Sequence, residues 1–284
     1  MTGEAFRFKV GAFDCISLND GYHEYYIETL FSNADRDDLE SALRAGDWPL
    51  DRVLSPYASL HVDTGEHHVL VDTGAGDYFT TTGKLPGNLR GAGVDPEEID
   101  MVVITHAHAD HMGGLLTEDG TPTYPNARVV TLQVEWDFWL AEDALEHVPG
   151  FERNIALAHR VFDTLGDRFS FVQPDTELVP GVRILAAFGH TPGQTVVEAS
   201  SSGESVLYLA DTVFHPLHIE HPEWLPDARY LFNVAQFRET ARRLLARAVE
   251  GKALVLGMHF PPFPCLGHVV DTGEGLQWQP VRAA

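Results

Sequence analysis

The hydrophobic residues of the chain occur in short runs of strand character, separated by amphipathic stretches of helical period. Runs rich in β-branched residues predict strands at 6–10, 58–62, 67–72, 101–105, 182–188, 194–199, 205–210 and 253–258. Helical spacing predicts helices at 134–145, 151–165 and 234–250, and Asp95 before Pro96 is a helix-start signal. Strands interspersed with helices predict a layered α/β sandwich, formed by one domain over residues 1–284.

The region before residue 50 is the exception to this regular pattern. Residues 22–50 have weak periodicity of either kind, and they include the aromatic run YHEYYIETLF. We therefore expect an N-terminal part, of about 50 residues, with irregular structure or with the role of an arm that contacts a partner.

Composition narrows the classes of function. Hydrophobic residues make up 44% of the 284 residues, which is enough for a sizeable core. The formal net charge of −23 argues against a nucleic-acid partner, because phosphate backbones are bound by clustered Lys and Arg. No stretch has the length of a membrane span, and the N-terminus lacks the pattern of a signal peptide. With only two cysteines, these features predict a cytoplasmic protein with no membrane partner.

The stretch ITHAHADHMGGL, residues 104–115, begins at the end of the predicted strand 101–105 and contains several residues of metal-ligand type. His106 and His108 alternate in an extended segment, so both can grip one ion. Asp110 and His111 follow where the chain turns into a helix, and they can face a second ion. Neutral imidazole and carboxylate suit zinc and similar divalent metals. Four ligand-type side chains at this spacing favour a metal site over an ordinary polar loop.

Further ligand-type residues stand at the ends of other apolar strands. His190, Asp211 and His259 each follow a predicted strand, and Asp72 ends the strand at 67–72. Strand ends at one edge of a sheet converge in space, so these side chains can meet the cluster that begins at His106.

The pattern His-x-His-x-Asp-His, followed by GHTPGQ, LADT and GMHF, resembles that of the metallo-β-lactamase superfamily from about residue 57 onward. The resemblance implies an αββα sandwich with the metals at one edge. It assigns His106, His108 and His190 to one ion, Asp110, His111 and His259 to the other, and Asp211 to a bridge between them. Asp72 would orient a ligand histidine by accepting its free N–H.

Two ions held this way can clamp a shared water and lower its pKa toward neutrality, which makes a bridging hydroxide the expected nucleophile. Zn²⁺ is the first expectation, and Mn²⁺, Fe²⁺ or Co²⁺ suit the same ligands. Asp211 as the bridge, and Asp110 as a ligand that could also protonate the leaving oxygen, are the expected catalytic residues. The predicted reaction is hydrolysis of an ester-like bond in a small molecule.

Within the superfamily, the phrase VDTGAGDYF and the segment around HFPPFPCLGHV most resemble methyl parathion hydrolase and its lactonase-like relatives. That branch implies lactones, esters or phosphotriesters as substrates, and we expect a homodimer. Tyr78, Phe79 and Trp139 match its pocket aromatics, although ordinary core packing is an equal alternative. Related lactonases carry a tyrosine where this chain has Phe214, which puts strict quorum-signal lactonase activity in doubt. His215 is a further expected pocket residue.

Four alternatives compete with this hypothesis. A nucleic-acid-processing member of the superfamily conflicts with the net charge. Di-iron redox relatives typically have a glutamate at the position of His108. Glyoxalase-type thioesterases usually end in a basic helical region, whereas the C-terminal segment here reads as loops and strand. A non-catalytic scaffold commonly lacks some ligands, and none is missing here.

Overall fold

The computed structural model describes residues 4–281. In this part of the chain two seven-stranded sheets face each other. The first sheet runs in sequence order through β1 Ala5–Val10, β2 Phe13–Tyr26, β3 Arg52–Asp63, β4 His68–Val71, β5 Met101–Val103, β6 Arg128–Leu132 and β7 Phe169–Val172. The second contains β8 Glu177–Val179, β9 Val182–Ala186, β10 Thr195–Ser201, β11 Glu204–Tyr208, β12 Leu254–Leu256, β13 Leu266–Asp271 and β14 Leu276–Pro280.

Strand alternation places the core of the first sheet on both of its faces. Met101 and Val103 of β5 belong to the cluster between the two sheets, whereas Val102 belongs to the cluster under the helices. The same split separates Val130 from Val129 on β6. Successive side chains of a strand point to opposite faces, so an unbroken apolar run is what a sheet covered on both faces requires.

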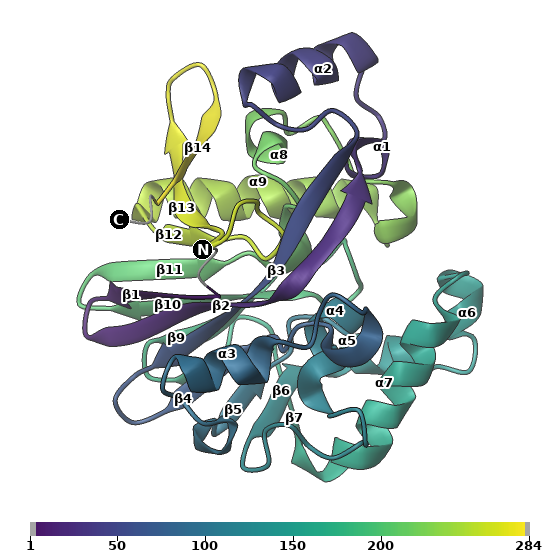
Figure 1. The fold of residues 1–284 in the computed structure, drawn as a ribbon, viewed down its shortest axis with the longest axis vertical. Helices are drawn as coiled ribbons and strands as arrows, with labels where there is room; N and C mark the ends of the chain where they lie inside the picture. Colours follow the sequence, from purple (N-terminus) through teal and green to yellow (C-terminus); the bar gives the residue numbers. More distant parts are fainter. Residues whose placement is uncertain (1–3, 282–284) are drawn as a thin grey trace.

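Helices cover the outer faces of the sandwich (Figure 1). The longer helices are α2 Arg36–Ala45, α3 Leu85–Gly91, α5 Gln133–Leu140, α7 Glu152–Leu165 and α9 Val234–Gly251. Short helices are α1 Ile27–Leu30, α4 Ala109–Met112, α6 Ala144–His147 and α8 Leu217–Glu220, with single 3-10 turns η1 Gly76–Tyr78, η2 Pro96–Glu98, η3 Gly113–Leu115, η4 Gly166–Arg168, η5 Ala210–Thr212 and η6 Ala228–Tyr230. α3, α5 and α7 pack on the first sheet, and α9 packs on the second. The α/β sandwich predicted from the sequence is confirmed.

The N-terminal region is more regular than expected, which corrects the expectation of irregular structure for residues 22–50. β2 extends to Tyr26, and α1 and α2 follow it. Leu39 and Leu43 of α2 are buried in one cluster with Leu217 and Trp224, which lie far along the chain. Contact of this region with a second copy of the chain stays a prediction.

Two smaller differences concern helices. The start signal at Asp95 does cap a helix, with its side chain accepting a hydrogen bond from Glu97 N, but the helix is the single turn η2. The predicted helix at 134–145 is divided into α5 and α6. Among the described helices, none combines the length and apolar character needed to cross a membrane.

Candidate metal centre

The ligand-type residues lie at one edge of the sandwich, as expected from their places after strands. β5 runs parallel to its neighbour β4, and β11 runs parallel to β12, so their carboxyl ends point the same way within each sheet. His106 and His108 follow β5 and lead into α4, which carries Asp110 and His111. The remaining ligand-type residues follow the ends of the second sheet's strands: His190 between β9 and β10, Asp211 in η5 after β11, and His259 after β12.

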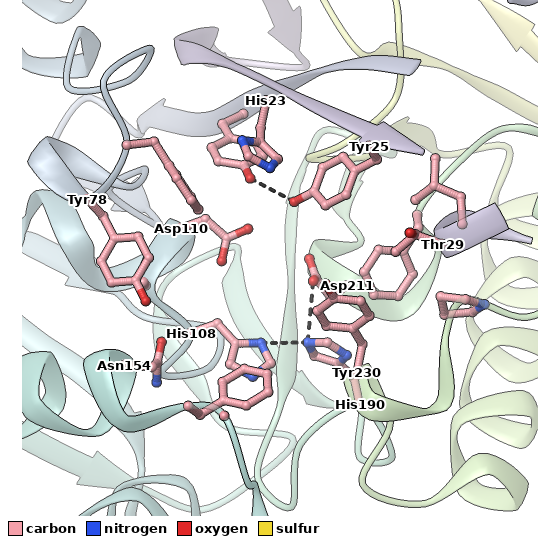
Figure 2. Close-up of a pocket in the computed structure, with 18 residues that line it drawn as sticks. His23, Tyr25, Thr29, Tyr78, His108, Asp110, Asn154, His190, Asp211 and Tyr230 are labelled. Carbon is pink, nitrogen blue, oxygen red and sulfur yellow. Dashed lines mark hydrogen bonds and ion pairs between the residues drawn. The ribbon is translucent and has the colours of Figure 1, made fainter. Parts of the chain in front are cut away.

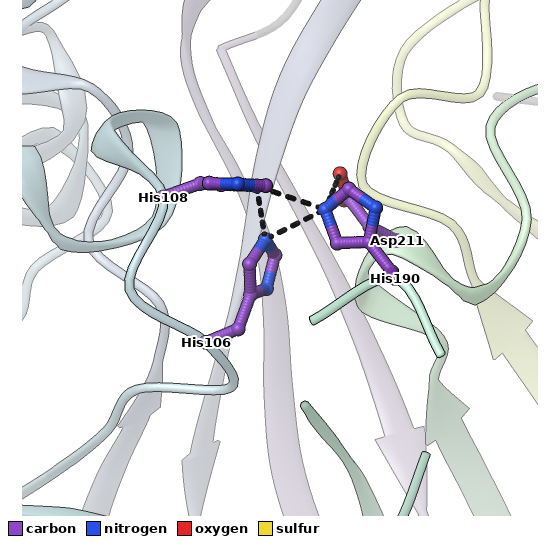
Figure 3. A group of neighbouring side chains, drawn as sticks. All are labelled: His106, His108, His190 and Asp211. Carbon is purple, nitrogen blue, oxygen red and sulfur yellow. Dashed lines mark hydrogen bonds and ion pairs between the residues drawn. The ribbon is translucent and has the colours of Figure 1, made fainter. Parts of the chain in front are cut away.

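Four of these residues form a first group (Figure 3). His190 Nε2 lies 2.8 Å from His108 Nδ1 and 3.2 Å from His106 Nε2. His106 Nε2 and His108 Nδ1 are 3.0 Å apart, and Asp211 Oδ2 is 3.3 Å from His190 Nε2. Three ring nitrogens and one carboxylate oxygen thus converge on one point, which is the donor set of a divalent-metal site.

Asp110, His111 and His259 form a second group. Asp110 Oδ2 lies 3.5 Å from His259 Nε2 and 3.9 Å from His111 Nε2. Asp211 reaches this group with its other oxygen: Oδ1 is 3.0 Å from His111 Nε2 and 3.2 Å from His259 Nε2. The two oxygens of one carboxylate therefore face two different ligand groups, which is the geometry of a bridge.

The donors fit a pair of divalent ions. Within each group the ligand atoms lie within 4.8 Å of one another. Apart from the ion-pair contacts within the two groups, His111 Nε2 and Asp211 Oδ1 are buried without a hydrogen-bond partner. Leaving such atoms unpaired is costly in a protein interior, and cations placed between them would satisfy both. All seven residues predicted as ligands from the sequence are brought together here.

The electrostatics separate the histidines into two kinds. Burial, together with the neighbouring imidazoles, lowers the pKa of His106 well below its usual range. Burial likewise lowers the pKa of His108 and of His190 to about 3, so each ring is neutral at physiological pH and has a free lone pair for a metal. His111 differs, because Asp211, Asp72 and Asp110 raise its pKa well above the usual range in spite of burial. A metal bound at the second group would displace that proton.

Asp72 supports the second group in the way expected from its place after β4. Its Oδ2 accepts a hydrogen bond from His111 Nδ1 at 2.7 Å, which turns His111 Nε2 toward Asp211. The same carboxylate accepts hydrogen bonds from Thr105 N, Thr105 Oγ1 and the Tyr208 hydroxyl. Asp72 has a φ of 58°, a strained value for a residue other than glycine, and these bonds hold it there.

A cavity of about 300 Å³ opens directly over the two groups (Figure 2). Tyr78, Phe79 and Phe214 line it, as expected from the sequence. Other lining residues were not expected, and they come mostly from β2 and β3 and the loop before α9: His23, Tyr25, Thr29, Tyr57 and Tyr230. The hydroxyl groups of Tyr25 and Tyr57 lie 2.7 Å apart. The wall is therefore aromatic, with a small number of hydroxyl groups near the metal ligands.

A family model described as the metallo-beta-lactamase superfamily matches residues 51–259, most of the chain. The chain belongs to the metallo-beta-lactamase superfamily. This confirms the resemblance carried by the His-x-His-x-Asp-His pattern, and it agrees with the ligand set described above.

Several superfamily members of known structure or activity are similar to this chain. An N-acyl homoserine lactonase of Bacillus thuringiensis is 24% identical over 213 residues, which cover 67% of this chain and 75% of that protein. Another, from Bacillus sp., is 24% identical over 133 residues, so the chain spans about half (46%) of that relative's length. The dizinc quorum-quenching lactonase AidC, solved with a product, superposes with a TM-score of 0.90 at 24% identity, covering 100% of this chain and 99% of AidC.

The hydrolase AbOPH superposes with a TM-score of 0.87 at 23% identity, covering 100% of this chain and 99% of AbOPH. These structural likenesses confirm the superfamily fold over the described residues. Together with the family match and the paired ligand groups, they support a metal-dependent hydrolase.

Two residues expected in the pocket do not line this cavity. Trp139 is buried behind His108, with the two ring centroids 5.2 Å apart. His215 is fully buried and packs edge-on against Phe31 and Trp48. The expectation for His215 followed from its closeness in sequence to Asp211. The chain turns after η5, however, and directs this ring toward the cluster beneath α2, which comprises Ile27, Leu30, Phe31, Leu39, Leu43, Val53, Leu217 and Trp224.

Glu135 is a buried carboxylate beside the first ligand group that the sequence did not single out. It lies in the first turn of α5, is fully buried, and accepts four hydrogen bonds. Its helix was predicted, and the position next to Trp136 falls on the buried side of that helix. A carboxylate on the same side of a predicted helix as Trp139, four residues later, is the sequence signal that could have found it.

Proposed function

We propose that the chain hydrolyses the ester-like bond of a small molecule, with a lactone as the preferred substrate and zinc as the metal. The main support for this proposal is the position of Asp211, whose two oxygens face two ligand groups at the floor of an aromatic cavity. The relatives named as N-acyl homoserine lactonases support the choice of a lactone. The aromatic wall suits a substrate with an apolar substituent.

The metal-binding residues determine what chemistry is accessible. When bound, two divalent ions would lower the pKa of a shared water and polarise the substrate carbonyl. Asp211 would keep the two cations close, because its negative charge offsets their repulsion. Asp110 keeps 17% of its side chain accessible, whereas Asp211 keeps 4%. We infer that Asp110, as the more open carboxylate, also passes a proton to the leaving oxygen.

Tyr25 and Tyr57 supply the polar contact that Phe214 lacks. Burial, and secondarily the charge of Asp110, raises the pKa of Tyr25 well above its usual range, so this hydroxyl is a donor. Figure 2 shows that the Tyr25 side chain lines the same cavity as Asp110 and Asp211. We propose that Tyr25 donates a hydrogen bond to a substrate oxygen while Tyr57 donates to the Tyr25 oxygen.

A substrate panel tests this function. The protein is stripped with a chelator, reloaded with zinc, and assayed with N-hexanoyl-homoserine lactone, an aryl ester, an aryl phosphotriester and a β-lactam. We expect the highest kcat/KM for the lactone, no turnover after stripping, and recovery with zinc, manganese or cobalt. Lactone that stays intact with a protein holding two zinc ions would refute the lactonase assignment, and preferred turnover of the ester or phosphotriester would reassign the substrate. Activity that survives exhaustive chelation would refute the metal mechanism.

A further inference from the structure

Glu135 is a carboxyl group at a place where neither the substrate cavity nor the metal ligand groups account for it, and burial raises its pKa. It is fully buried beside Trp136 and Trp139, and it belongs neither to the ligand groups nor to the cavity lining. Burying a carboxylate costs free energy unless hydrogen bonds satisfy it. All four of its partners are donors, so the ionised form is the one that the site satisfies.

The two oxygens of Glu135 hold two different loops. Oε1 accepts a hydrogen bond at 2.9 Å from the backbone N of Ala107, the residue between His106 and His108. Oε2 accepts from Thr191 Oγ1 at 2.6 Å and from Gly193 N at 2.9 Å, directly after His190. The first loop leaves the first sheet and the second loop joins strands of the second sheet. One side chain thus ties together the loops that carry all three histidines of the first group.

Other contacts tighten the same connection. Trp139 Nε1 donates to Glu135 Oε1 at 2.8 Å, and the Trp139 ring packs edge-on against His108. A Cβ added at Gly193 would lie only 2.6 Å from Glu135 N, so the second loop can approach α5 this closely only with glycine there. This close approach gives a physical reason for Gly193, the second glycine of the GHTPGQ segment.

We propose that Glu135 is a positioning residue that fixes His106, His108 and His190 relative to one another and thereby sets the metal affinity of the first group. The inference rests on the metal assignment of the proposed function. Glu135 makes its hydrogen bonds to Ala107, Trp139, Thr191 and Gly193 and none to Asp110, His111 or His259, so the affinity of the second group should depend on this carboxylate much less.

The test is metal titration of the Glu135→Gln variant. Glutamine has nearly the same shape, but its amide nitrogen cannot accept the two hydrogen bonds made to the oxygen that it replaces. Zinc is titrated into the metal-free protein in competition with a chromophoric chelator, and cobalt absorption spectra report the ligand geometry. We expect one of the two binding constants to fall about 10- to 100-fold, as is typical when a partner of a metal ligand is lost. The other constant should change less than about threefold.

Asp20→Asn is the matched control. Asp20 is likewise fully buried, and it accepts hydrogen bonds from Ala75 N, Gly83 N and Leu85 N, away from both loops of the first group. This variant should lose stability while both zinc constants stay close to those of the wild type. If Glu135→Gln fails to fold, Thr191→Val removes a single donor and should weaken the same constant by a smaller factor.

The outcomes are distinct. Wild-type constants in Glu135→Gln, or an equal fall of both constants, would overturn the positioning role. A wild-type protein that binds fewer than two zinc ions would refute the metal assignment before any variant is compared. A protein that binds two zinc ions without hydrolysing any ester would refute the proposed function and leave the role of Glu135 standing.

Discussion

Asp211 is the residue on which both ligand groups depend. Its Oδ2 faces His190 and its Oδ1 faces His111 and His259, so removal of the side chain takes a ligand from each group at once. We predict that Asp211→Ala lowers kcat by more than about 100-fold, beyond what is typical for the loss of an outer partner. Zinc content by elemental analysis and turnover of the preferred substrate measure this. Two retained zinc ions with unchanged turnover would exclude the bridging role.

The residues of the two proposed ligand groups, and Asp72 beside His111, could be predicted from the sequence, whereas the buried carboxylates that hold distant loops in place could not. His106, His190 and Asp211 stand after apolar strands, and strand ends meet at a sheet edge, so their convergence follows from the sequence pattern alone. Glu135 and Asp20 are different, since each owes its role to backbone N–H groups of distant loops. In the sequence, a buried Asp or Glu cannot be told from an exposed one, because the N–H groups that bind it come from segments far away in the chain.

α2 supports the wall of the cavity, although it lies far in sequence from the residues of the candidate metal centre. It covers α1 and α8, and α1 carries Thr29 and Leu30 of the lining. We predict that Leu43→Ala, at a fully buried position of α2, lowers the free energy of unfolding by about 2–5 kcal/mol, through lost burial and a cavity. Urea unfolding measures the change.

Leu54→Ala is the control for this prediction. Leu54 of β3 is 54% exposed, so its truncation should change the free energy of unfolding by less than about 0.5 kcal/mol. An equal loss in both variants would mean that α2 is not packed as described. A rise in KM for Leu43→Ala with two zinc ions retained would show that α2 supports the substrate side of the site.

Elements with regular apolar periods were predictable, and those stabilised by distant partners were not. β5 and α9 follow from local pattern. β2 was not among the predicted strands, and its pairing with β3 shifts register between Asn19 and Tyr22, which interrupts the alternation. α2 was missed because only Leu39 and Leu43 are buried on it, and the cluster that buries them includes Leu217 and Trp224, more than 170 residues away.

For the molecule as a whole, lowering the pH has two opposite effects on the free energy of unfolding. The formal charge of −23 makes the folded chain repel itself, and protonation of carboxylates on acidification relieves this repulsion. Buried histidines act in the other direction. Burial lowers the pKa of His61 and of His218 to about 4, so both are neutral in the folded protein at pH values where the unfolded chain protonates them.

His218 allows the histidine effect to be isolated, because it lies outside the metal centre. Its Nε2 lies 2.9 Å from the backbone oxygen of Leu30 and its ring packs against Phe31. A lowered pKa means that the unfolded state binds more protons between pH 6.5 and about 4, so stability falls as the pH falls through this window. At pH 5 we predict a loss of about 2 kcal/mol from this residue, from 1.36 kcal/mol per pH unit.

The His218→Gln variant provides the comparison, since glutamine can donate to Leu30 O but does not titrate. Free energies of unfolding of both metal-free proteins are measured in urea at pH 7.5 and pH 5. The change in carboxylate charge is common to both proteins and cancels in the difference. We expect the wild type to lose about 2 kcal/mol more than the variant on acidification. Equal losses would mean that the His218 ring takes up its proton in the folded state, which would require water to reach the cluster beneath α2.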